Sequence, residues 1–366
     1  MLRQVCRLGK PVLSRKYSTV SETKDHDPLN ILFCGADKFS IYSLRALHKF
    51  QQTRPDKIVS IDVLCRPDKR TGRGLKHVQA VPIKSVATEL GLSLHHIDTF
   101  KGWQAPSNIN LVVAVSFGLL VPGTLLRAAK YGGLNVHPSL LPRFRGAAPI
   151  EHTLLERCAT TGVTLQTMHP TRFDHGAILS QKTTPITHER RPNEMVELLG
   201  PIGADLLVDG IERGLFIPPY PETLTSGHEA SYAPKLTPAD RNIDWDSWTA
   251  DDILVRDEVL GGLWDTVSYS RCHGLVRTAA EQRVKFEGPW QILDTVVDHK
   301  TSDLRSAGYP VVVGKTNEKV GLCTMDGRIV QPSEITISGK PKGSGHQILS
   351  SVLRKSNDQL QYPDGT

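Results

Sequence analysis

An asparagine and a histidine lie two positions apart at the end of a short apolar run. Asn135 and His137 fall at the end of Gly133–Val136, which reads as a buried strand. Side chains two apart on an extended backbone point the same way, so an amide and an imidazole would converge. Such a pair can stabilise a developing oxyanion, and an imidazole can also move a proton near neutral pH. The structural alternative is a histidine that caps a loop and an asparagine bonded to the backbone.

The residues that follow suggest a preorganised loop. Three prolines between residues 138 and 149 stiffen the backbone, and Gly146 permits conformations that a side chain would forbid. A carboxylate, Asp174, lies in a turn between two predicted strands. It would orient His137 and stabilise its charged form, or accept a proton through water. Otherwise Asp174 is an ordinary turn residue.

Nucleotide and metal chemistry have little support. The turn Cys34–Phe39 lacks two glycines of a dinucleotide fingerprint, and Thr71–Gly74 matches no phosphate-binding loop. No metal is expected, because no compact ligand spacing occurs among His137, His152, His169, Asp174 and His175. The 6 cysteines form no C-x-x-C pair, which excludes a disulfide framework or zinc knuckle and fits a reducing compartment.

Charge is unevenly distributed. The chain has 44 Lys+Arg and 38 Asp+Glu, a formal net charge of +6. Residues 1–21 contain five of the bases and no acid, which predicts a mitochondrial presequence, with a basic tail as the alternative. Without them the balance is 39 to 38, so a nucleic-acid partner would need a local patch. A membrane protein is excluded, because apolar runs such as Leu111–Val115 stop far short of about 20 residues.

Apolar runs and helical periodicity alternate through the first half of the chain. Strands are predicted at Leu29–Cys34, Lys57–Leu64, Asn110–Val115 and Gly133–Val136, and a strand pair at Gly162–Met168 and Ala177–Pro185. Helices are predicted at Phe39–Phe50, Val81–Leu90, Pro122–Ala129 and Asn193–Arg213. This alternation indicates α/β architecture, a twisted and mainly parallel sheet with helices on both faces.

Composition changes after residue 215. Prolines with Ser, Thr and Gly predict a linker at 216–240, following a catalytic domain at 29–215. Short β-branched runs then predict a smaller, mostly-β, barrel-like domain at 241–366.

These motifs carry a family resemblance. Asn135–Pro142, Arg145–Ile150 and Asp174-x-Gly176 resemble the formyltetrahydrofolate-dependent formyltransferases, which have a Rossmann-like fold. The wider match is closest to the members that formylate methionyl-tRNA. It includes Pro67–Gly74, Val115–Pro122, Gly162–Thr164, Ser231–Leu236 and Ile243–Trp245.

The resemblance implies a reaction and its residues. The formyl group of 10-formyltetrahydrofolate would pass to the free α-amine of initiator methionyl-tRNA, without a metal, in the mitochondrial matrix. Asn135 and His137 would bind the formyl oxygen, and Asp174 would hold His137 protonated or relay the amine's proton. The folate pocket would be formed by Phe117, Gly118, Leu119, Ser139, Leu140, Leu141 and Pro142.

A basic loop and a smaller second patch would contact tRNA. The loop contains Lys69, Arg70, Arg73 and Lys76, and the second patch contains Lys340 and Lys342. Within the resemblance Arg73 would enter near the first base pair, and the protein is expected to be a monomer. Two alternatives stay open: a formyltransferase or hydrolase that uses a small substrate, and a non-catalytic RNA-binding module.

Overall fold

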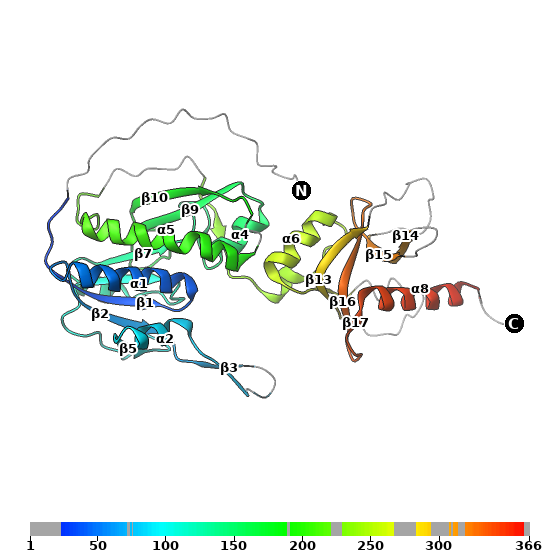
Figure 1. Ribbon diagram of the computed structural model, residues 1–366, viewed down its shortest axis with the longest axis horizontal. Helices are drawn as coiled ribbons and strands as arrows, with labels where there is room; N and C mark the ends of the chain where they lie inside the picture. The colour runs from blue at the N-terminus through cyan, green and yellow to red at the C-terminus, as the bar shows by residue number, and fades with distance from the viewer. Residues whose placement is uncertain are drawn as a thin grey trace, which may run out of the picture.

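The structure is a computed structural model. It describes residues 23–361 except 72–73, 75, 189–190, 221–228, 267–282, 294–306, 309 and 314–318. The predicted presequence at 1–21 and Arg73 therefore lie outside the described residues. The described chain forms two large sheets with separate cores, which lie side by side in Figure 1.

The first sheet has seven strands in the order β10-β9-β7-β6-β1-β2-β5. The five strands from β7 to β5 are parallel, whereas β9 and β10 are antiparallel to their neighbours. The predicted α/β fold with a mainly parallel sheet is confirmed. The strands are β1 (Leu29–Gly35), β2 (Ile58–Cys65), β5 (Ser93–His96), β6 (Leu111–Val115), β7 (Gly133–His137), β9 (Thr160–Thr167) and β10 (Ile178–Pro185).

Side chains alternate between the two faces along each central strand, and both faces of this sheet are buried. In β1, Ile31 and Phe33 join one core, and Leu32 and Cys34 join the other. The first core is covered by four helices: α1 (Lys38–Thr53), α2 (Pro82–Glu89), α4 (Pro149–Leu155) and α5 (Pro192–Glu212). The second core lies under α3 (Gly123–Ala128) and the loop at 97–109.

A hairpin leaves the carboxyl end of β2. Its strands, β3 (Lys69–Thr71) and β4 (His77–Gln79), pair in antiparallel register. Figure 1 shows β3 reaching away from the rest of the sheet and its helices. Because β2 runs parallel to β1, β6 and β7, the hairpin starts at the sheet edge where those strands also end.

The second sheet is antiparallel, as expected for a mostly-β region. Its order is β12-β13-β16-β15-β14, with β17 paired to β16. Helix α8 (Gly345–Gln361) contributes Leu349 to its core. The strands are β12 (Leu263–Asp265), β13 (Val284–Leu293), β14 (Pro310–Val313), β15 (Lys319–Cys323), β16 (Ile329–Ile337) and β17 (Gly343–Ser344).

One helix joins the first sheet's core to that of the second sheet. Helix α6 (Ala250–Leu260) places Val259 and Leu260 in the core under α1, α2, α4 and α5, and Ala250 and Ile253 in the core of the second sheet. An ion pair of 2.9 Å between Arg157 and Asp252 adds a polar contact. No helix among the described residues is long and apolar enough to cross a membrane.

The region predicted as a linker is partly built into the first half. Within it, β11 (Tyr232–Ala233) pairs in parallel with β8 (Arg145–Gly146), the loop that follows His137. A short 3-10 helix, η2 (Pro238–Arg241), comes next. The segment 231–233 therefore braces the loop beside the candidate site.

Candidate active site

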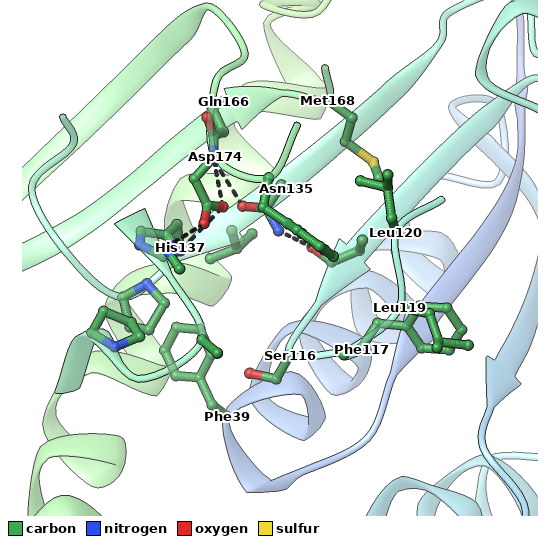
Figure 2. Close-up of a pocket in the computed structure, with 18 of the residues that line it drawn as sticks. Phe39, Ser116, Phe117, Leu119, Leu120, Asn135, His137, Gln166, Met168 and Asp174 are labelled. Carbon is green, nitrogen blue, oxygen red and sulfur yellow. Dashed lines mark hydrogen bonds and ion pairs between the residues drawn. The ribbon is translucent and has the colours of Figure 1, made fainter. Parts of the chain in front are cut away.

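A cavity of about 800 Å³ opens where β1, β6 and β7 end. This is the edge at which open parallel sheets hold their ligands, and the volume suits an organic ligand. Figure 2 shows Asn135 and His137 on one side and Phe117 and Leu119 on another. Six of the predicted site residues line it: Phe117, Gly118, Leu119, Asn135, His137 and Asp174.

The amide of Asn135 is held at both ends. Its Nδ2 donates to the carbonyl oxygen of Ala114 on the neighbouring strand at 3.0 Å. Its Oδ1 accepts from Nε2 of Gln166 at 3.0 Å. The Ala114 bond uses one of the two Nδ2 hydrogens, so the second is the donor that Asn135 can offer in the cavity.

Asp174 is fixed by its backbone and by three donors. Its φ of 57° lies in the left-handed region, which turns the chain sharply between β9 and β10. Its Oδ2 accepts from the Gly146 backbone N–H at 2.8 Å, and its Oδ1 from Gln166 at 3.2 Å. Its carbonyl oxygen accepts from Nε of Arg145 at 2.9 Å.

The turn around Asp174 also depends on close backbone packing. A Cβ added to Gly176 would lie 1.6 Å from the carbonyl oxygen of Thr167, so no side chain fits there. The next residue, Ala177, donates its N–H to Oγ1 of Thr167 at 2.8 Å. The carboxylate is therefore aimed by a rigid turn.

The contacts of His137 determine where its protons lie. Nε2 is 2.9 Å from the carbonyl oxygen of Phe144, an acceptor, so Nε2 must carry a proton. Nδ1 is 3.4 Å from Oδ1 of Asp174. This distance allows an ion pair with the carboxylate when the imidazole carries both protons. The two side chains are only 6% and 9% exposed, and the pair is held out of bulk water.

Both nitrogens of His137 therefore have protein partners in this arrangement. For His137 to donate to a substrate oxygen, the imidazole must exchange one partner, Phe144 or Asp174. Asn135 needs no such exchange. Sequence spacing predicted the convergence of the two side chains but gave no sign of this difference between them.

Gln166 was missed by sequence reasoning. It lies on β9 directly opposite Asn135 in the antiparallel pairing and bonds to both Asn135 and Asp174. Figure 2 shows its amide between these two side chains. The signal was the one amide in the predicted strand Gly162–Met168, where a buried polar side chain needs a partner.

Ser139, Leu140 and Leu141 are buried, Pro142 is half-buried, and none of the four lines the cavity. Their backbone is held by Thr164, whose hydroxyl donates to the Ser139 carbonyl at 2.7 Å and accepts from Leu141 N–H at 3.1 Å. Gln181 donates to the Leu141 carbonyl at 2.8 Å. In the structure this segment shapes the loop after His137.

The predicted basic residues occupy different surroundings. Lys69, Arg70 and Lys76 are exposed on the β3–β4 hairpin, and Lys340 is exposed beyond β16. Lys342 instead lies 2.5 Å from both Glu287 and Glu334. Its ammonium is therefore largely neutralised by these carboxylates.

Other titratable groups near the sheet edge are tuned by burial. Desolvation raises the pKa of the Asp37 carboxyl, which caps α1 and lines the cavity. Burial raises the pKa of the Cys65 thiol to about 11, which makes it a poor nucleophile at neutral pH. The described residues contain no group of three or more His, Cys, Asp or Glu side chains that could hold a metal ion.

Comparisons with known proteins identify the family to which this sequence is similar. The sequence profile of the formyl transferase family matches residues 29–209, which span the first sheet and the cavity. The mitochondrial methionyl-tRNA formyltransferase of Saccharomyces cerevisiae is 35% identical, over 68% of this chain and 72% of that protein. The human mitochondrial methionyl-tRNA formyltransferase is 31% identical, over 66% of this chain and 60% of that protein.

A bacterial relative is similar to the same degree. The methionyl-tRNA formyltransferase of Methylobacillus flagellatus is 37% identical, over 59% of this chain and 70% of that protein. The first half of the chain is thus a formyl transferase domain by its sequence. The chain belongs to the methionyl-tRNA formyltransferase family.

Proposed function

We propose that the protein transfers the formyl group of 10-formyltetrahydrofolate to the α-amine of initiator methionyl-tRNA. The observation that carries the proposal is the joined set of Asn135, His137 and Asp174 at the base of a ligand-sized cavity. Membership of the methionyl-tRNA formyltransferase family supports the choice of donor and acceptor.

The geometry suits acyl transfer to an amine. A bond forms between the amine nitrogen and the formyl carbon, and the bond from that carbon to N10 of the folate then breaks. The carbonyl oxygen becomes an oxyanion on the way, and the second Nδ2 hydrogen of Asn135 is placed to bind it. The amine loses one proton and N10 gains one. The contact between His137 and Asp174 places this pair to act as the relay.

Donor and acceptor would approach from different parts of the sheet edge. Phe117–Leu119 follow β6 and supply an apolar wall for the folate. The β3–β4 hairpin follows β2 and presents Lys69, Arg70 and Lys76 toward the acceptor end of tRNA, with Arg73 in the same loop. Ser139–Pro142 would contribute by holding His137 in place.

We also propose that the protein works in the mitochondrial matrix as a monomer, without a membrane anchor. The relatives named as mitochondrial support this location, as does the acid-free basic segment at 1–21.

The test is formyl incorporation by the purified protein from 10-formyltetrahydrofolate into methionyl-tRNA. His137→Ala and Asp174→Asn should each lower kcat at least about 100-fold with little change in KM. Asp56→Asn is the control, because Asp56 lies on the surface, where it pairs with Arg54 at 2.8 Å. Formylation of a small amine but not of methionyl-tRNA would overturn the proposal.

A further inference from the structure

Gln166 is a buried amide that faces the reaction cavity. Its side chain is 1% exposed, and it lines the cavity from β9. The register of β7 and β9 places it directly opposite Asn135, where side chains on one face of a sheet meet.

Gln166 uses one nitrogen to bind two oxygens. Nε2 lies 3.0 Å from Oδ1 of Asn135 and 3.2 Å from Oδ1 of Asp174. A carboxylate oxygen only accepts, so the atom facing Asp174 must be the nitrogen. The two N–H groups of Gln166 therefore tie the amide of Asn135 to the carboxylate that contacts His137.

This bridge decides which way the amide of Asn135 points. The Ala114 carbonyl requires a donor at 3.0 Å, and the Gln166 N–H requires an acceptor at 3.0 Å. Turning the amide over would set oxygen against oxygen on one side and N–H against N–H on the other. Gln166 thus keeps an N–H of Asn135 available in the cavity.

The bridge has a cost in stability. Oε1 of Gln166 is buried and has no hydrogen-bond partner among the described residues. Buried acceptors are usually paired, and an unpaired one destabilises the fold. Methionine has a similar length and would leave no unpaired atom of its own. The two N–H donors of Gln166 therefore explain why position 166 has an amide and not an apolar side chain.

We infer that Gln166 is a positioning residue for formyl transfer: it fixes the Asn135 amide and the Asp174 carboxylate in the orientation that the reaction needs. The inference rests on the proposed function and adds to it a residue that acts through two others. Gln166 itself need not touch the formyl group.

Two substitutions test the inference. Gln166→Met keeps the volume and removes both donors, so kcat should fall about 10- to 100-fold with KM for both substrates nearly unchanged. Gln166→Glu places an acceptor against Oδ1 of Asn135 and of Asp174, so kcat at neutral pH should fall further.

The pH profile separates positioning from a general structural effect. The carboxyl introduced by Gln166→Glu would face Asp174, which His137 and Arg145 also contact. Protonation of the introduced carboxyl would restore an O–H donor toward Asp174. The activity of Gln166→Glu relative to wild type should therefore rise as pH falls from 8 toward 6. Gln166→Met should show no such recovery.

Gln331→Met is the matched control. Gln331 lies on β16 in the second sheet, donates to the Val320 carbonyl at 2.5 Å, and does not line the cavity. Its loss should lower the unfolding midpoint and leave kcat of the folded enzyme within about twofold. Gln166→Met with wild-type kcat, or a parallel loss of kcat in Gln331→Met, would overturn the inference. Failure of the wild-type protein to formylate methionyl-tRNA would instead contradict the proposed function.

Discussion

Gly146 donates its backbone N–H to Oδ2 of Asp174 at 2.8 Å, from a conformation that only glycine adopts readily. Its φ is 116°, and an added Cβ would lie 2.6 Å from the carbonyl oxygen of Ala233. The loop after His137, the carboxylate and the β11 segment thus meet at one α-carbon. Packing at Ala233 therefore affects where the carboxylate of Asp174 lies.

Gly146→Ala should therefore damage both stability and catalysis. The backbone must shift to relieve the strain and the clash, at a cost of about 1–3 kcal/mol. The same shift weakens the bond to Asp174, and kcat should fall at least about tenfold. Urea unfolding and steady-state formylation measure the two effects.

Gly91→Ala provides the comparison for this prediction. Gly91 also has a positive φ, 68°, but nothing lies within 4 Å of its added Cβ. The strain alone should cost about 1 kcal/mol and leave kcat unchanged. An equal loss of kcat in both variants would refute the link between Gly146 and Asp174.

Thr164→Val should destabilise the loop after His137. The substitution keeps the shape but removes the hydroxyl that donates to the Ser139 carbonyl and accepts from the Leu141 N–H, so both hydrogen bonds are lost. The expected loss in the free energy of unfolding is about 3 kcal/mol, measured in urea. Thr153→Val should be neutral or stabilising, because the buried Thr153 hydroxyl has no partner among the described residues. Equal effects of the two changes would contradict this account.

The basic residues should contribute unequally to binding of tRNA. Lys69→Ala and Arg70→Ala remove exposed charges from the hairpin. Each should raise KM for methionyl-tRNA and reduce the slope of log KM against log salt by about one unit, with KM for the folate unchanged. Lys342→Ala should change the slope less, because Glu287 and Glu334 already neutralise that lysine. A larger effect at Lys342 would show that tRNA displaces these carboxylates.

Glu287 should add stability that depends on pH. Lys285 and Lys342 lower the pKa of its carboxyl from 4.5 to about 2. Because the folded pKa is depressed, the contribution is present above about pH 4.5 and is lost as pH falls toward 2. Glu287→Gln should reduce the free energy of unfolding at pH 7 by about 1 kcal/mol after solvent screening. The deficit should shrink at pH 3; an unchanged deficit would rule out this origin.

The central strands were predictable because both faces of a parallel strand are buried, which leaves continuous apolar runs. The predicted Leu29–Cys34 and Asn110–Val115 differ from β1 and β6 by one residue at one end. The edge strand β5 was missed because its residues, Ser93–His96, are only partly buried and include two histidines. Helix α6 was missed because acidic residues interrupt its apolar periodicity.

The predicted catalytic residues lie on one strand and in one turn, both of which the sequence indicates. Strand alternation placed Asn135 and His137 together, and the turn between β9 and β10 brings Asp174 to them. The role of Gln166 depends on the antiparallel register of β7 and β9, and the pairing of Lys342 depends on carboxylates from β13 and β16. Such partners are set by tertiary pairing, which spacing along the chain does not encode.

Helix α6 packs into the cores of both halves, so we expect the two halves to unfold together. Removing the chain after residue 240 would take Val259 and Leu260 out of the core that also contains the helices over the first sheet. The exposed apolar surface would favour aggregation of the remaining fragment. In calorimetry we expect a single heat-absorption peak for the intact chain. The second half of the chain, which includes α6, thus covers apolar surface of the catalytic half and supports its solubility.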